Sequence, residues 1–248
     1  MKHTEVIKPE YIDEYVETHR MLYRTLSIMI SDVNFIKACV DLNDVELHHD
    51  WISLKYLHGV VFEDLIMRTY KAFFDNKGTD ATNLFKFKNS VKGKYLKPEY
   101  VDRVKVDIAT SRLEADKEYK KTRLEDLSKN IIYLHDKYVG HGILNAKEEF
   151  KVNLSDIKEL LEYGCELFQR LSFEPKGFYD PLLESDGYDF SREFSYTEKS
   201  LSDFIRYTML SSSYVKSIDC VIDEDCKEFA VGKKLQRMID DINESKSP

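Results

Sequence analysis

Proline and glycine are scarce in this chain, and long apolar runs are missing from it. Five prolines and nine glycines among 248 residues are compatible with long helices joined by short connections. The densest early apolar run, residues 26–30, is far too short to span a bilayer, and the N-terminal segment lacks the apolar core of a signal peptide. Apolar residues nevertheless make up 42% of the chain and aromatic residues 12%, which is enough for a sizeable core.

Cysteine is also rare, and its spacing is not that of a metal site or a redox motif. None of the four cysteines forms a CxxC pair. We expect free thiols in a reducing compartment, and therefore a cytoplasmic protein; a Cys220–Cys226 bridge is the alternative.

The charge balance argues against generic nucleic-acid binding, but the charges are unevenly distributed. The net charge is −8, from 37 basic and 45 acidic residues. Residues 84–105 carry seven basic side chains against two acidic ones, whereas residues 174–203 carry eight acidic against three basic. Within the basic stretch, KFKNSVKGKY (86–95) alternates lysines with aromatic residues, which is typical of a surface that contacts phosphates and bases. The candidate substrate-binding residues are Lys86, Lys88, Lys92 and Lys94; the alternative is a solvated face whose Phe85 and Phe87 help the core.

Apolar residues at spacings of three and four predict an all-α fold. Four to five long helices form a bundle over residues 1–173, followed by an acidic loop and a helical C-terminal extension over 174–248. His19 lies on the buried stripe of the first helix and is predicted to be a hydrogen-bonded core histidine. The expected helices cover 10–41, 51–74 (capped by Asp50), 79–91 (capped by Thr79 or Asp80), 99–139 with a break near 115–118, and a helix after Asn153 or Ser155 that ends near 171.

One stretch, IIYLHDKYVGHGI (131–143), combines groups that move protons near neutral pH with a helix end that exposes them. On a straight helix at 100° per residue, His135 and His141 diverge by about 120°. We therefore expect either that the helix ends at the glycines and His141 turns back, or that a second chain completes the site. Lys137 lies on the flank nearest His141, where it reaches a phosphate, whereas Asp136 points away from the apolar stripe.

The segment LHDKYVGH (134–141) is similar to the LRDKxxAH segment of the HEPN superfamily, in which an arginine is followed a few residues later by a histidine. Together with RTYKAFFD (68–75) and the helix over 152–171, it most resembles the abortive-infection, AbiU-like branch. The resemblance covers residues 20–173. It implies a helical bundle that dimerises so that two motifs face one cleft, and a metal-independent endoribonuclease, a hydrolase of toxin–antitoxin and phage-defence systems.

The resemblance places His141 at the family histidine, Asp136 at the polar position, and His135 where the family has arginine. Arginine offers phosphate a permanently charged fork, whereas histidine is only partly protonated at pH 7. In one hypothesis RNA cleavage survives, with His135, Asp136, Lys137 and His141 as the catalytic residues of an antiviral toxin. In the other, the domain is a degenerate dimerisation, nucleotide-binding or antitoxin-type module. The expected partners are a second copy of the chain, RNA, and an antitoxin or other defence protein, without a membrane.

A third hypothesis is a metal phosphohydrolase of the HD type, because His135 and Asp136 form a literal HD pair in an all-helical chain. That class needs further ligands from separate helices, and His48, His49 or His58 are the candidates. Adjacent residues such as His48, His49 and Asp50 do not converge on one ion from a regular element. The sequence therefore predicts no metal site and no cofactor.

Overall fold

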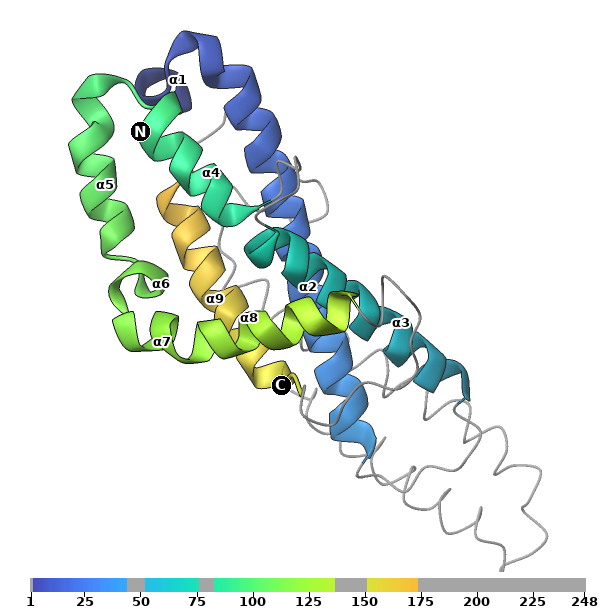
Figure 1. Ribbon diagram of the computed structural model, residues 1–248. Coiled ribbons are helices and arrows are strands. Elements are labelled where there is room, and N and C mark those ends of the chain that lie inside the picture. The colour runs from blue at the N-terminus through green and yellow to red at the C-terminus, as the bar shows by residue number, and fades with distance from the viewer. Residues whose placement is uncertain (1, 44–51, 76–82, 137–150, 174–248) are drawn as a thin grey trace, which may run out of the picture.

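The computed structural model describes residues 2–43, 52–75, 83–136 and 151–173 (Figure 1), and there the fold is all-helical. Within these ranges, extended pairing is limited to one antiparallel bridge between Ile7 and Leu96. The all-α prediction is confirmed for this part of the chain, and no helix in it is long and apolar enough to cross a membrane. The predicted acidic loop and C-terminal extension lie outside the described residues.

The longest helix, α2 (Ile12–Asn43), follows the short α1 (His3–Val6) and a 3₁₀ turn (Pro9–Tyr11). Alongside α2 runs α3 (Ile52–Thr69), which continues into the π-helical turn η2 (Tyr70–Phe74). Both helices agree with the predicted ranges, although the π turn was not foreseen. The buried stripe of α2 consists of Tyr15, His19, Leu22, Leu26, Met29, Val33 and Ile36.

The short helix α4 (Leu84–Ser90) and the π turn η3 (Val91–Tyr95) follow the second helix. Asn83 caps α4, because its side chain accepts a hydrogen bond from the Lys86 backbone N–H at 3.0 Å. The prediction of Thr79 or Asp80 as the cap is therefore wrong. Asn83 also donates to the Asp75 carbonyl at 3.2 Å, so one amide both caps α4 and ties it to the end of η2.

The expected long helix over 99–139 is divided into shorter pieces. After a 3₁₀ turn (Pro98–Tyr100) come α5 (Val101–Ala109), α6 (Arg112–Ala115), α7 (Lys117–Lys121) and α8 (Arg123–Leu134). The predicted break is confirmed at Asp116, whose carboxylate caps α7 through the Tyr119 N–H at 2.8 Å. A second break was missed at Ser111, whose hydroxyl donates to the Ile108 carbonyl and competes with the helical pattern. These breaks turn the chain, so that α8 crosses the direction of α5 in Figure 1.

The last described helix, α9 (Leu154–Arg170), starts after Asn153, as predicted. It buries one apolar face against the bundle and contacts α2, α5, α6 and α8. Ion pairs hold the chain between α5 and α8 to its outer side: Arg112 with Glu166, Arg170 with Asp107, and Arg123 with Asp156 and Glu159.

Tyr15 and His19 connect α2 to the end of α9. The Tyr15 hydroxyl donates to the Leu171 carbonyl at 2.8 Å and accepts from the Phe173 N–H at 2.9 Å. Because the Ser172 hydroxyl donates to the Phe168 carbonyl, it accepts from His19 Nε2 at 2.8 Å. Burial lowers the pKa of His19 to about 3, so the ring is neutral at pH 7. The prediction of a core histidine is confirmed.

Gly164 on α9 faces the ring of Phe73, which leaves no room for a side chain at this position. A Cβ atom at this position would lie 2.6 Å and 2.7 Å from the Cζ and Cε1 atoms of Phe73. Phe73 belongs to η2 and is only 1% exposed, so its ring has little room to withdraw.

We predict that Gly164→Ala lowers the free energy of unfolding by about 1–3 kcal/mol, because the new methyl overpacks the contact with Phe73. Gly59→Ala is the matched control: it lies in α3 and its Cβ would meet nothing within 4 Å. The control should gain about 0.5–1 kcal/mol from higher helix propensity. Urea unfolding of the three proteins measures both effects, and equal stability of the two variants would contradict the close approach.

Candidate functional site

Two of the four predicted catalytic residues, His135 and Asp136, are described by the structure, and they directly follow α8 in a π-helical turn. His135 is the C-cap residue, and its Nδ1 lies 3.0 Å from Asp136 Oδ1. The His135 side chain is 21% exposed and that of Asp136 is 58% exposed, so the pair lies at the edge of the core and faces solvent. Lys137 and His141, the other predicted catalytic residues, lie outside the described residues.

An aromatic ring from the second helix covers one face of this imidazole. The rings of Tyr70 and His135 are stacked, with centroids 3.7 Å apart and an interplanar angle of 13°. Tyr70 is the first residue of η2, which packs against α8. Nothing in the spacing of residues along the sequence indicated that Tyr70 would contact His135.

The surroundings of the stack are acidic. Burial raises the pKa of the Tyr70 phenol, and the negative charges of Asp75 and Asp136 add to this effect. Two carboxylates therefore lie close enough to the phenol to act on it electrostatically. Such a site offers an imidazole held between an aromatic face and a carboxylate.

The arginine nearest to Tyr70 in the sequence, Arg68, is already held by carboxylates. It forms an ion pair with Asp64, one helical turn earlier, and its Nε lies 4.0 Å from Asp32 Oδ2 on α2. Asp32 is mostly buried, and its Oδ2 has no hydrogen-bond partner among the described residues. Burial, and secondly the charge of Asp64, raise the pKa of Asp32 to about 7, although Arg68 counteracts them.

The predicted substrate-binding lysines lie on α4 and η3, and two of them are engaged in ion pairs. Lys88 contacts Glu114 at 2.7 Å, and Lys94 contacts Glu14 at 2.8 Å. Glu14 and Asp32 are 18 positions apart on α2, which corresponds to about 27 Å along the helix. Lys94 lies beside Glu14, whereas Arg68 lies near Asp32, so the two cations are far apart along α2. Tyr70 follows Arg68 by two residues and stacks on His135, so the structure does not bring Lys94 together with His135.

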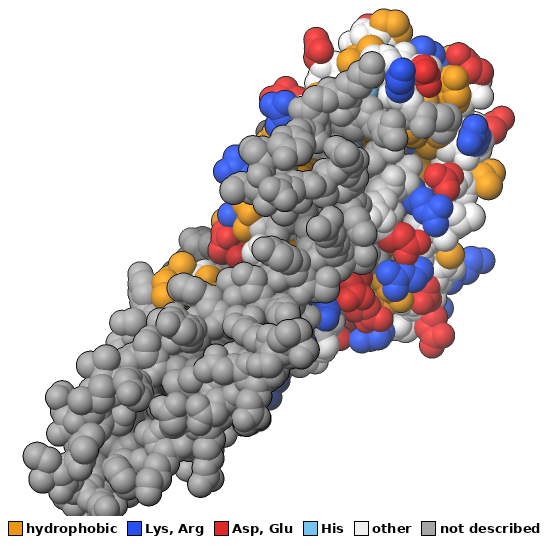
Figure 2. All heavy atoms as spheres, turned by 180° about the vertical axis from the view of Figure 1, so that it is seen from behind, with side chains coloured by type: hydrophobic (Ala, Val, Ile, Leu, Met, Phe, Trp, Pro, Cys, Tyr) orange, Lys and Arg blue, Asp and Glu red, His pale blue; other side chains and the backbone are white. Residues whose placement is uncertain are grey.

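The described surface also lacks a patch of one sign on the side seen in Figure 2. Basic and acidic side chains are interspersed on the coloured part of this face. This pattern gives no strong field to attract RNA from that side.

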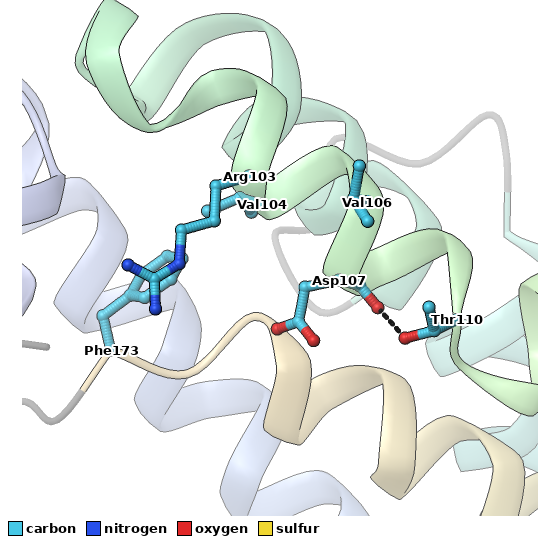
Figure 3. A pocket seen from close by; sticks show the side chains of 6 residues that line it. All are labelled: Arg103, Val104, Val106, Asp107, Thr110 and Phe173. Atoms are coloured by element: carbon cyan, nitrogen blue, oxygen red, sulfur yellow. Dashed lines mark hydrogen bonds between the residues drawn. The ribbon is translucent and has the colours of Figure 1, made fainter.

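A hollow of about 330 Å³ lies on α5 and the end of α9 (Figure 3). Its lining combines apolar and charged side chains, and Figure 3 shows Arg103 extending toward Phe173. The Asp107 carboxylate is already paired with Arg170 at 2.9 Å. None of the predicted site residues lines this hollow, which is formed by Arg103, Val104, Val106, Asp107, Thr110 and Phe173.

No group of three or more His, Cys, Asp or Glu side chains that could hold a metal ion occurs in the part of the chain that the structure describes. His58 lies on α3 and is half-buried, whereas His48 and His49 lie outside the described residues.

The comparisons with known proteins add no relative. No protein-family model, curated protein or solved structure matches the chain. In the described residues the chain is an all-helical protein with a hydrogen-bonded His135–Asp136 pair, whose imidazole is stacked on Tyr70.

The raised pKa of Asp32 leads to a prediction about pH. Between pH 3.8 and about 7 the folded state binds more protons at this carboxyl than the unfolded state, so its contribution to stability declines as the pH rises through this window. Asp32→Asn removes the buried charge. Its free energy of unfolding should exceed that of the parent by about 1–4 kcal/mol at pH 8, and the difference should vanish near pH 4.

Urea unfolding at several pH values measures this difference. Glu17→Gln, at an exposed position of the same helix, is the control and should leave the pH dependence unchanged. A constant difference between Asp32→Asn and the parent from pH 4 to pH 8 would show that Asp32 does not titrate in this range.

Proposed function

We propose that this chain is a HEPN-type protein that acts on RNA, a metal-independent endoribonuclease of abortive-infection defence. The observation that carries the proposal is the His135–Asp136 hydrogen bond at the end of α8, against the ring of Tyr70. It supplies an oriented imidazole at the place where the resemblance puts the reaction. The HEPN-like bundle and the AbiU-like affiliation are part of the same proposal.

The proposed reaction is an internal transesterification of RNA. One imidazole accepts the proton of the ribose 2′-hydroxyl while the oxygen forms a bond to phosphorus. The bond from phosphorus to the 5′-oxygen breaks, and a second, protonated imidazole donates a proton to the leaving oxygen. The products are a 2′,3′-cyclic phosphate and a 5′-hydroxyl, so the step needs neither a metal ion nor a redox partner.

The remaining parts of the proposed site come from the resemblance. His141 supplies the second imidazole, and Lys137 or the lysines of α4 and η3 other than Lys94 of the same chain hold the phosphate. A homodimer brings two motifs to one cleft and thereby supplies two sets of these groups. An antitoxin or another defence protein then controls the activity.

A second candidate function is a non-catalytic module for dimerisation or for binding a nucleotide or a partner. It is favoured by the ion pairs of Arg68, Lys88 and Lys94, because paired cations are less available to a phosphate. The carboxylates of Asp75 and Asp136 near the stack also repel phosphate. An activity assay separates this candidate from the endoribonuclease.

We predict that the purified chain cleaves single-stranded RNA in the presence of EDTA. His141→Ala should reduce the rate by about 10²–10⁴-fold, because a general acid or base is lost. His58→Ala serves as the control, since His58 is half-buried on α3 and has no place in the proposed reaction. Gel analysis of labelled RNA measures the rate, and circular dichroism verifies that each variant is folded.

If neither EDTA nor added manganese or magnesium supports cleavage by the parent, the endoribonuclease is rejected in favour of the binding module. Cleavage that requires a divalent ion would instead favour the HD-type phosphohydrolase.

His135→Arg separates two roles of this residue: if His135 holds the phosphate as the family arginine does, the variant should keep or raise the cleavage rate, whereas if His135 accepts the proton, the variant should lose the activity, because arginine accepts no proton. His135→Gln is the comparison variant, as it removes both the charge and the proton exchange, and it should lose the activity. The same RNA assay measures both variants. An arginine variant as inactive as the glutamine variant would show that the imidazole itself is required at this position.

A further inference from the structure

We propose that His135 acts as the general base through its Nε2 atom, and that Tyr70 is the positioning residue that holds its ring. This inference rests on the proposed function, which requires an acid and a base but does not assign them. It also assigns a role to Tyr70, which belongs to a segment 65 positions earlier in the chain.

The hydrogen bond to Asp136 determines which nitrogen carries the proton. An ionised carboxylate only accepts hydrogen bonds, so the 3.0 Å contact between Nδ1 and Oδ1 requires a hydrogen on Nδ1. In the neutral ring Nε2 then carries a lone pair. Nε2 has no hydrogen-bond partner among the residues that the structure describes, and the ring retains 21% of its exposure. The neutral ring is therefore prepared to accept a proton rather than to donate one at Nε2.

The stack on Tyr70 restricts the orientation of this ring. The ring of Tyr70 lies nearly parallel to the imidazole, with the ring centroids 3.7 Å apart, and covers one face of it. This contact opposes a rotation of the imidazole away from the parallel orientation. His135 follows the last residue of α8 and keeps a helical backbone, which by itself does not fix the orientation of its ring. Tyr70 is anchored by the π turn, whose Ala72, Phe73 and Phe74 are buried. The ring of Tyr70, which is held by the buried π turn η2, thus orients the ring of His135.

In the reaction this arrangement gives each atom one task. The 2′-hydroxyl proton moves to His135 Nε2, the 2′-oxygen attacks phosphorus, and the resulting imidazolium retains its Nδ1–H bond to Asp136. The 5′-oxygen leaves with a proton from a different group. Asp136 is therefore also a positioning residue, because it contacts the general base His135 and not the RNA.

Nuclear magnetic resonance of the full chain with ¹⁵N-labelled histidine tests the geometry without RNA. His135→Gln identifies the His135 signals among those of the seven histidines. At pH 8 the parent should show the tautomer with hydrogen on Nδ1, and Asp136→Ala should convert it to the Nε2–H form. Asp126→Ala, an exposed carboxylate on the same helix, should leave the tautomer unchanged.

The carbon-bound ring protons of His135 report the stack. They should shift downfield in Tyr70→Leu, because the ring current of Tyr70 is lost, and stay near their parental positions in Tyr70→Phe. An Nε2–H tautomer in the parent, or unchanged ring protons in Tyr70→Leu, overturns the proposed geometry.

Cleavage of RNA with a 5′-thio leaving group tests the assignment of the base. A thiolate leaves without a proton, so this substrate rescues the loss of an acid but not of a base. His135→Ala should lose about 10²–10⁴-fold in rate on both the normal and the 5′-thio RNA. Parental rates of His135→Ala on the thio substrate would make His135 the acid and overturn the proposal.

Tyr70→Leu and Asp136→Ala should lower kcat about tenfold or more with KM unchanged, whereas Tyr70→Phe should resemble the parent. Parental kcat in Tyr70→Leu overturns the positioning role. If the parent shows the expected tautomer and stack but cleaves neither the normal nor the 5′-thio RNA, the proposed function is refuted. The role of His135 as general base is then refuted with it, whereas the geometry of His135, Asp136 and Tyr70 is confirmed.

Discussion

The hydroxyl of Tyr15 is the contact on which the rest of the described structure depends, because it joins the first long helix to the end of the last one. It is buried and engages both the Leu171 carbonyl and the Phe173 N–H. Loss of either bond leaves a backbone group unsatisfied in the core, which costs about 1–3 kcal/mol. With α9 held against α2 in this way, Gly164 lets the helix approach Phe73 of η2. The same π turn carries Tyr70 to His135, so the candidate site depends on packing far from it.

The electrostatics of the site limit how an RNA strand could be bound. Asp75 and Asp136 lie near the stack, and Arg68 shares its charge with Asp64 and Asp32. Lys94 belongs to the opposite end of α2, where it also contacts the rings of Tyr11 and Tyr95. The described part of one chain therefore contributes an oriented imidazole rather than a phosphate clamp. In the proposed endoribonuclease, cations other than Arg68 and Lys94 of the same chain therefore hold the phosphate.

Several features could be inferred from local patterns because they depend on local chemistry. Apolar spacing predicted α2, α3 and α9 and the burial of His19, since a stripe on a helix must face a core. The break at Asp116 was also predicted, but the buried break at Ser111 was not. The Ser111 hydroxyl donates a hydrogen bond to the Ile108 carbonyl at this break. A serine occurs both inside helices and at their ends, so its presence alone did not predict the break. The cap of α4 was misplaced for a similar reason, because the choice of Asn83 depends on the Asp75 carbonyl from another element.

The sequence by itself determined that the described chain is helical and that a histidine–aspartate pair lies on one of its helices. Both follow from residue type and spacing along one element. Only the tertiary structure decided that Tyr70 stacks on His135 and that two of the four candidate lysines, Lys88 and Lys94, are ion-paired, with Lys94 at the opposite end of α2. These contacts join segments that are distant in sequence, and their geometry depends on a π turn, a helix crossing and one close approach at a glycine. The periodicity of residues within one segment does not predict contacts between distant segments, such as that of Tyr70 with His135.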